Sequence, residues 1–441
     1  MSKNYVAVIQ AGGRGTRMRE LTKDLIPKPM LILNGKPMIQ WQMENMVQYG
    51  IHEFIFIIGY LGEKIKEYFG DGHRFGVNIR YIEESQPLGS AGSLYYLKGM
   101  IQENDFFLLY ADVMFCLDWN RMIDFHERHR GKATLLVHPN AHPFDSDLLI
   151  MDEEEHVTGI DSKLNFRTYW YENCVNAGLY ILSKDILSEL SVPERLDLEK
   201  DILSPMMTEN QVYGYRTPEY VKDAGTPERF YKVAKEQTAG VWEDKCLNRK
   251  QKCVFLDRDG TLNQFKGLLY KEEELELEKN AADAIKLLNE AGVLAIVITN
   301  QPVVARGLCS IEEVNQIHRK MQVMLGAQGA YLDDIAFCPH HPDKGYPDEN
   351  PKYKMSCSCR KPATGMIDAM VKKYNIDCSL SYMVGDSTID IQTGVNAGLK
   401  TILLETGQGG QDGKFHVSPD VVEKDVKSAV EYILRSFGKL R

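Results

Sequence analysis

Short runs of β-branched and aromatic residues alternate with amphipathic segments along the whole of this 441-residue chain. Segments of helical period include KPMIQWQMENMVQYG (36–50) and NAADAIKLLNEAG (280–292). The strand-like runs are YVAVIQ (5–10), EFIFIIGY (53–60), FFLLYADV (106–113), KCVFLDRD (252–259) and LAIVITN (294–300). This alternation is typical of α/β proteins, in which helices cover a largely parallel sheet. It therefore predicts an α/β fold.

Two of the strand-like runs, YVAVIQAGG and KCVFLDRDG, end in Gly-rich or Asp-rich turns, and each has the form of a domain's first strand. The chain is long enough for two domains, and its 44% hydrophobic residues suffice for two packed cores. A basic polar cluster, CLNRKQK, precedes the second of these runs. We therefore predict two doubly wound domains, 1–240 and 251–441, joined by a linker at 241–250.

Composition excludes several classes of partner. A formal net charge of −10 argues against broad binding to nucleic acid or anionic membranes. There is no apolar run of the roughly 18 residues that a membrane span needs. The nine cysteines are an odd number spread over both halves, so a disulfide framework is not expected. We expect a cytoplasmic protein with small-molecule substrates and no nucleic acid or membrane partner. The sequence does not predict the oligomeric state.

A glycine-rich loop follows the first strand, in QAGGRGTRMRELTKDLIPKPM (10–30). Its glycines, Gly12, Gly13 and Gly15, let backbone N–H groups approach an anion closely. Such a loop alone also fits a simple turn. Arg17 and Lys28 add two cations that suit phosphate groups, so the loop indicates a nucleotide site.

The pattern G-G-x-G-T-R followed by P-K-P resembles the signature of sugar-1-phosphate nucleotidyltransferases. Further segments are similar to that family's motifs in the same order: EESQPLGSAGSL, LLYADVMF, VNAGLYIL and VKDAGTPERF. The resemblance implies a Rossmann-like domain that joins a sugar 1-phosphate to a nucleoside triphosphate and releases pyrophosphate. It assigns the residues as follows: Mg²⁺ to Asp112 and Asp223, the leaving pyrophosphate to Arg17, the α-phosphoryl group to Lys28, the nucleotide to Gly12, Gly13, Gly15, Gln86 and Gly89, and the sugar to Asn176 and Gly178.

This half departs from the family pattern in two places. Ala111 stands where many relatives have Gly before the metal-binding Asp, and DSKLNFR replaces the usual EKP, which leaves Lys163 as the phosphate contact there. Gln10, Gln86 and Gly89 suit the edge of a purine or of a pyrimidine, so these residues do not identify the nucleobase.

In the second half, FLDRDGTLN places Asp257 and Asp259 two residues apart after a buried strand. That spacing suits a nucleophile and an acid/base partner. It resembles the D-x-D-G-T signature of the haloacid dehalogenase superfamily, and VITNQ, CRKP and MVGDSTID match the later motifs. The resemblance implies an aspartyl-phosphate intermediate on Asp257, with Asp259 as acid and base. It also implies phosphate contacts from Thr299, Asn300 and Lys361, and Mg²⁺ held by Asp257, Asp259 through its carbonyl, and Asp386.

The stretch from Asp259 to VITN is too short for a separate cap domain, so we expect a capless, open cleft. Between these motifs, FCPHHPDKGYPDENPKYKMSCSCRKP (337–362) concentrates metal-ligand residues. Cys338, His340, Cys357 and Cys359 suit tetrahedral zinc, with His341 as the substitute for His340. Four protein ligands leave no open position, so this zinc is expected to be structural and to position Arg360 and Lys361.

The set D-R-D-G-T, T-N-Q, A-R-G, C-P-H-H-P and C-x-C-R-K-P resembles D-glycero-D-manno-heptose 1,7-bisphosphate 7-phosphatases. Histidinol phosphatases share the zinc loop, but ARGLCS (305–310) is closer to the heptose enzymes, which makes Arg306 a substrate contact. Pro302 and Val303 replace the usual Ser and Gly of this loop.

The two halves would then catalyse consecutive steps, because removing the 7-phosphate leaves a heptose 1-phosphate for nucleotidyl transfer. This pairing favours the α anomer, GTP and a GDP-heptose product. The alternatives are ADP-heptose synthesis from the β anomer, mannose 1-phosphate as acceptor, histidinol phosphate as the phosphatase substrate, or one half as a non-catalytic binding module.

Overall fold

The computed structural model describes residues 5–440, which divide into two compact units. The first unit runs to Cys246 and the second runs from Leu247, while two short segments, 139–146 and 163–173, group with the second unit. The stretch 241–250 contains the point at which the chain passes from the first unit to the second. Within that stretch, Val241 and Trp242 are buried in a hydrophobic cluster of the first unit. In the described chain, no helix combines the length and apolar character needed to cross a bilayer.

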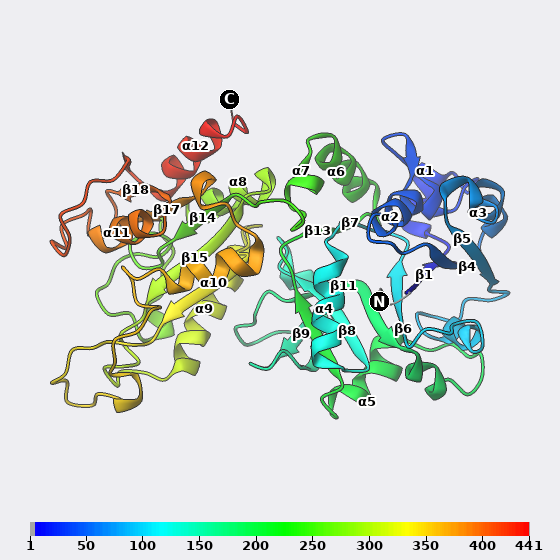
Figure 1. The fold of residues 1–441 in the computed structure, drawn as a ribbon, viewed down its shortest axis with the longest axis horizontal. Coiled ribbons are helices and arrows are strands. Elements are labelled where there is room, and N and C mark those ends of the chain that lie inside the picture. The colour runs from blue at the N-terminus through cyan, green and yellow to red at the C-terminus, as the bar shows by residue number, and fades with distance from the viewer. Residues whose placement is uncertain (1–4, 441) are drawn as a thin grey trace. The chain divides into compact units, whose positions relative to one another are not determined.

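The first unit is built on a mixed sheet in the order β10-β9-β11-β6-β1-β4-β5, with β8 and β12 joined to it at β11 (Figure 1). Strands β6, β1, β4 and β5 are parallel, whereas β11 pairs antiparallel with β6. The strands are β1 (Val6–Ala11), β4 (Glu53–Ile58), β5 (Asn78–Glu83), β6 (Asp105–Tyr110), β8 (Ala133–His138), β9 (Leu148–Met151), β10 (Val157–Asp161), β11 (Val175–Ser183) and β12 (Val212–Arg216).

Both faces of this sheet are buried, because neighbouring residues of a strand point to opposite sides. In β1, Ala7 and Ile9 join one hydrophobic cluster, and Val6 and Val8 join the other. The first cluster is covered by the longer helices and the second by short turns and α5. The helices are α1 (Arg19–Thr22), α2 (Met38–Val47), α3 (Gly62–Phe69), α4 (Trp119–His129), α5 (Ser204–Met207), α6 (Pro227–Thr238) and α7 (Val241–Asp244).

Two antiparallel ribbons complete the first unit. Strands β2 (Ile32–Leu33) and β3 (Lys36–Pro37) form a small hairpin. Strands β7 (Val113–Cys116) and β13 (Tyr220–Asp223) pair so that Asp223 lies opposite Val113. The second ribbon therefore brings Asp112 and Asp223, which are far apart in sequence, to the same end of the sheet.

The second unit is built on a parallel sheet in the order β16-β15-β14-β17-β18-β19 (Figure 1). Its first strand in the chain, β14, lies in the middle, so connections pass to both sides as in doubly wound folds. The strands are β14 (Cys253–Leu256), β15 (Leu294–Asn300), β16 (Asp334–Cys338), β17 (Tyr382–Gly385), β18 (Lys400–Leu404) and β19 (Val421–Glu423).

Helices cover both faces of this parallel sheet. Helices α8, α9 and α12 pack on one face, and α10 packs on the other. Their bounds are α8 (Ala281–Ala291), α9 (Ile311–Gly326), α10 (Gly365–Tyr374), α11 (Thr388–Asn396) and α12 (Val426–Ser436). The predicted α/β class with two wound sheets is confirmed, with the refinement that the first sheet is mixed.

Candidate functional site

A pocket of about 510 Å³ lies at the carboxyl ends of β1, β4 and β6 in the first unit. Ligands of α/β folds bind at this edge of the sheet, and the volume suits a nucleotide. Most of the residues predicted for the nucleotide and its phosphates line it: Gln10, Gly12, Gly13, Gly15, Arg17, Lys28, Gly89 and Asp112. Gln86 and Lys163 are exposed and are not among the lining residues.

Glu84 also lines this pocket, and sequence reasoning did not single it out. It follows β5 directly, and its carboxylate accepts from the Leu88 backbone N–H at 3.4 Å. Burial raises the pKa of Glu84 above its usual range. A Cβ at Gly12 would lie 2.3 Å from Glu84 Oε2, so the absence of a side chain at Gly12 leaves room for this carboxylate. The signal in sequence is only an acidic pair, which usually marks a solvated surface.

The two aspartates predicted to hold Mg²⁺ are each paired with a cation. Lys28 Nζ contacts Asp112 Oδ2 at 2.5 Å, although the Lys28 side chain is only 9% exposed. Arg229, in the first turn of α6, contacts Asp223 Oδ2. Asp223 Oδ1 is buried and has no hydrogen-bond partner among residues 5–440. A buried, unpartnered carboxylate oxygen is the kind of ligand that Mg²⁺ takes, so this pair fits the metal.

The predicted sugar contacts lie on β11, beside the pocket-lining Tyr110. A Cβ at Gly178 would meet the Tyr110 ring at 2.6 Å, and Asn176 Oδ1 accepts from the Gly178 N–H. Asn176 Nδ2 and the hydroxyls of Tyr110 and Tyr180 all donate to Glu199, in the π-helical turn Leu198–Leu203. Sequence reasoning missed Glu199, because its partners come from two other strands.

In the second unit, the predicted phosphatase residues lie at the carboxyl ends of three neighbouring strands. Asp257 and Asp259 follow β14, Asp386 follows β17, and Thr299 and Asn300 end β15. Parallel strands present these ends at one edge of the sheet, so chain segments far apart in sequence supply a single site.

Lys361 ties the nucleophile candidate into this site. Its Nζ contacts Asp257 Oδ1 at 2.8 Å and Asp390 Oδ1 at 2.5 Å. Asn300 holds the Lys361 backbone from both sides, accepting from its N–H at 2.9 Å and donating to its carbonyl at 3.1 Å. Asp390 is itself fixed by a capping box with Ser387 at the start of α11.

Three carboxylates, those of Asp257, Asp386 and Asp390, offer oxygens within 4.8 Å of one another. Burial raises the pKa of Asp257 to about 6, with Asp390 and Asp259 adding to the shift and Lys361 opposing it. Burial and the neighbouring carboxylates raise the pKa of Asp386 to about 8. Like charges this close disfavour ionisation unless a cation joins them, so the arrangement fits Mg²⁺.

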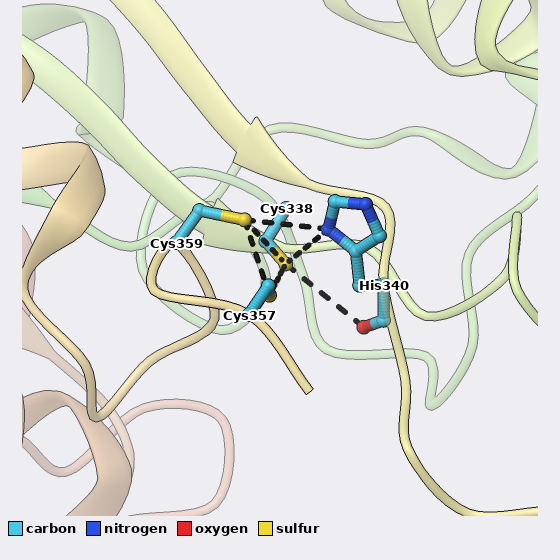
Figure 2. Close-up of side chains that lie close together, drawn as sticks. All are labelled: Cys338, His340, Cys357 and Cys359. Carbon is cyan, nitrogen blue, oxygen red and sulfur yellow. Dashed lines mark hydrogen bonds between the residues drawn. The ribbon is translucent and has the colours of Figure 1, made fainter. Parts of the chain in front are cut away.

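Cys338 at the end of β16 forms a cluster with His340, Cys357 and Cys359 of the loop that follows (Figure 2). The Sγ–Sγ distances are 3.5 Å for Cys338–Cys357 and 3.2 Å for both Cys359–Cys338 and Cys359–Cys357. His340 Nδ1 lies 3.6 Å from Cys338 Sγ and 3.3 Å from Cys359 Sγ. Four Cys and His ligand atoms within 4.8 Å of one another are the donor set that zinc takes, so the cluster fits zinc. It is His340 rather than His341 that belongs to this cluster.

The cluster is bonded to the phosphatase site on both of its sides. The Cys338 carbonyl accepts from the Gln301 N–H at 2.8 Å, and Gln301 Nε2 donates to Asp259. Arg360 donates to the His340 carbonyl at 3.0 Å, directly before Lys361. A metal that closes the cluster would therefore hold both segments in place.

Cations gather around Tyr346 in the same loop. Arg306 lies 4.5 Å and Lys354 lies 4.9 Å from the centre of the Tyr346 ring. Arg306 Nε is buried without a hydrogen-bond partner in the described part of the chain. Burial lowers the pKa of His341, and Arg360, Arg306 and Lys354 add to this shift. Lys354 is also paired with Glu349 at 3.4 Å, so its charge is balanced and Arg306 is the cation of this group that best suits an anion.

The nucleotidyl transferase family model matches residues 6–240, and a HAD-hydrolase-like model matches residues 358–429. The D-glycero-D-manno-heptose-1,7-bisphosphate 7-phosphatase of Thermosynechococcus vestitus is 40% identical over 187 residues, which cover 41% of this chain and 94% of that protein.

In the first half, the mannose-1-phosphate guanylyltransferase of Mycobacterium tuberculosis is 27% identical over 237 residues, covering 53% of this chain and 65% of that protein. The solved structure of HddC from Yersinia pseudotuberculosis, complexed with GMP-PN, is 26% identical with a TM-score of 0.45, covering 53% of this chain and 99% of that one. The chain thus belongs to the nucleotidyl transferase family and, through its C-terminal half, to the HAD-like heptose bisphosphate 7-phosphatases.

Proposed function

We propose that this enzyme makes a GDP-heptose in two consecutive reactions. The second unit would remove the 7-phosphate of D-glycero-α-D-manno-heptose 1,7-bisphosphate, and the first would transfer GMP from GTP to the resulting heptose 1-phosphate. The observation that carries the proposal is the presence of both sites in one chain, since the phosphatase product is a sugar 1-phosphate.

In the phosphatase step, Asp257 Oδ attacks phosphorus while the bond to the sugar oxygen breaks and Asp259 gives that oxygen its proton. Asp259 then takes a proton from water as the water oxygen attacks the aspartyl phosphate. Lys361, held against Asp257, and the strand-end residues Thr299 and Asn300 would bind phosphoryl oxygens, as the family resemblance implies. Mg²⁺ bound by the carboxylate cluster would screen these carboxylates from the anionic substrate.

Arg306 Nε, which is buried and has no hydrogen-bond partner in the part of the chain that the structure describes, supports a bisphosphate substrate. Lys361 serves the phosphate that is cleaved, so a second cation suits the phosphate that stays on the sugar. Histidinol phosphate carries one phosphate and a cationic amine, and Arg306 would repel that amine.

In the transferase step, the Gly-rich loop, Arg17 and Lys28 would bind the triphosphate as the sugar phosphate displaces pyrophosphate in line. Asp112 and Asp223 would hold Mg²⁺, which would supply positive charge to offset that of the phosphates. Lys28 would move its contact from Asp112 to the phosphoryl group.

Glu84 supports guanine as the base. It lies in the pocket wall formed by the loop whose sequence resembles the family's base-contacting loop. An ionised carboxylate only accepts hydrogen bonds, and guanine offers two adjacent donors, N1–H and the 2-amino group. Adenine presents an acceptor at N1, which a carboxylate repels. The guanylyltransferase relative agrees with this assignment.

The deciding experiment incubates the protein with each anomer of heptose 1,7-bisphosphate and each nucleoside triphosphate, and identifies the nucleotide sugar by mass. We expect GDP-heptose from the α anomer and GTP. ADP-heptose from the β anomer and ATP alone would overturn the proposal. Faster phosphate release from histidinol phosphate, or GDP-mannose formation faster than GDP-heptose formation, would change the substrate assignment of one unit.

A further inference from the structure

The carboxylate of Asp259 is held by three side chains. Oδ1 accepts from Asn263 Nδ2 at 3.0 Å and from two guanidinium nitrogens of Arg258, Nε at 3.3 Å and NH2 at 3.0 Å. Oδ2 accepts from Arg258 NH2 and from Gln301 Nε2, both at 2.9 Å. The Asp259 side chain keeps 18% exposure, so one edge of the group stays open.

Arg258 is fixed at its other side. It is fully buried, at 0% exposure, and its NH1 donates to His318 Nε2 of α9 at 3.2 Å. Burial and Arg258 lower the pKa of His318 well below its usual range, so the imidazole is neutral and accepts. Burying a guanidinium is costly unless its donors are paired. This Arg is therefore anchored between a helix and the acid/base candidate.

Gln301 connects the same carboxylate to the rest of the site. Its Oε1 accepts from Arg258 NH2 at 3.0 Å, and its Nε2 also donates to Thr299 Oγ1 at 3.0 Å. Its backbone N–H donates to the carbonyl of Cys338. Arg258, which follows β14, and Gln301, which follows β15, thus hold both the carboxylate and each other.

The fixed position of the Asp259 carboxylate matters because a sugar alkoxide is a poor leaving group. As its bond to phosphorus breaks, its oxygen must receive a proton from Asp259 across a hydrogen-bond distance. A displacement of about 1 Å in such a group can slow a reaction about 100-fold. A carboxylate gripped along both oxygens cannot rotate away from the departing oxygen.

We propose that Arg258, together with Gln301, is a positioning residue that keeps the Asp259 carboxyl aimed at the oxygen leaving phosphorus. This inference rests on the proposed phosphatase function. Arg258 is fully buried, so it acts only through Asp259, and replacing it should slow each reaction in proportion to that reaction's need for the Asp259 proton.

The test compares two leaving groups in single turnovers with enzyme in excess. One substrate is heptose 1,7-bisphosphate, whose alkoxide needs a proton, and the other is p-nitrophenyl phosphate, whose phenolate leaves without one. For Arg258→Met we expect formation of heptose 1-phosphate to slow about 100-fold or more, within the range of general acid catalysis. Release of nitrophenolate should slow less than about tenfold. Equal slowing of both reactions would overturn the inference.

Three further variants make the outcome decisive. Asp259→Asn should show the same dependence on the leaving group; if it slows both substrates equally, the acid role in the proposed function is wrong, whatever Arg258 does. Gln301→Met removes one hydrogen-bond donor to Asp259 and takes away no charged group. If Arg258→Met does not fold, Gln301→Met should show the same larger slowing of the heptose bisphosphate reaction.

Asp333→Asn is the structural control, because Asp333 is a buried carboxylate that accepts from the Ala295 N–H. It should not alter the ratio of the two rates.

Discussion

The proposed contact between the Glu84 carboxylate and guanine makes GTP binding depend on pH. Burial raises the pKa of Glu84, so the group takes up a proton at a higher pH than an exposed glutamate does. The protonated form loses acceptor capacity toward guanine. We therefore expect GTP affinity to fall as the pH is lowered through this raised pKa, and to be restored above it. Calorimetric titration of GTP across the acidic range would measure the effect.

Glu84→Gln should remove that pH dependence and weaken GTP binding about 10- to 100-fold, since hydrogen bonds to a charged group contribute about 1.5–3 kcal/mol. The matched control is Glu83→Gln, because Glu83 is the exposed neighbour and pairs with Lys66 at the surface. The guanine contact is wrong if both variants bind GTP as the wild type does, or if Glu83→Gln has the larger effect.

At the scale of elements, the cysteine loop and the glycine-rich segment after β18 each hold one side of the phosphatase site. Cys357→Ser replaces one of the four clustered ligands. We expect the purified variant to lose its bound zinc and most of its phosphatase activity, because Arg360, Lys361 and Gln301 are bonded to this loop or follow it. Nucleotidyl transfer should be unchanged.

Metal analysis and the two activity assays would check this expectation. Cys378→Ser is the control, since Cys378 is partly exposed and lies outside the cluster. Zinc retained at the wild-type level in Cys357→Ser would show that the cluster is not the site of the metal.

The segment after β18 reaches the carboxylate of Asp386. The Gln408 N–H donates to Asp386 Oδ2 at 2.7 Å, and Gly407 has a φ of +57°. A Cβ at Gly407 would lie 2.0 Å from Asp386 Oδ2 and 2.7 Å from the Gly260 Cα, so something must move. We expect Gly407→Ala to raise the Mg²⁺ concentration needed for half-maximal phosphatase activity.

Gly413 is a control position that distinguishes the effect of backbone strain from the effect of the clash with Asp386. It also has a positive φ, of +60°, but a Cβ there would meet nothing within 4 Å. Gly413→Ala should therefore leave the Mg²⁺ requirement near that of the wild type. An equal shift in both variants would mean that loop strain, rather than contact with Asp386, is responsible.

At the scale of the whole molecule, the two candidate sites lie in separate units, each with its own sheet. Asp257→Asn removes the proposed nucleophile and should abolish phosphate release while leaving GDP-heptose synthesis from supplied heptose 1-phosphate intact. Asp112→Ala removes a proposed metal ligand and should leave heptose 1-phosphate as the end product. Chromatography of the sugar phosphates would distinguish these two products.

Mixing the two single variants tests whether both sites must be on one chain. Diffusion of heptose 1-phosphate between molecules should restore GDP-heptose formation in the mixture. Unchanged phosphate release in Asp257→Asn would contradict the nucleophile, and unchanged nucleotide-sugar formation in Asp112→Ala would contradict the transferase site.

The α/β class and many of the elements could be predicted from sequence because they depend on local patterns. LAIVITN is β15 over its whole length, and the segment 280–292 contains α8, since an unbroken apolar run and a 3.6-residue period each favour one structure. The motif residues after β14, β15 and β17 could be predicted to share a site for a similar reason, because parallel strands end at one edge.

Contacts that close over long distances in the sequence could not be predicted in this way. The packing of distant segments decides these contacts. Examples are the antiparallel pairing of β11 with β6, the position of the Glu84 carboxylate next to Gly12, and the exposure of Gln86 and Lys163. The sequence by itself determined two α/β sheets, their families and the strand ends that carry the chemistry. Only the tertiary structure decided which neighbour holds each reactive group, as with Arg258 and Gln301 on Asp259, because side-chain partners are chosen by packing in three dimensions.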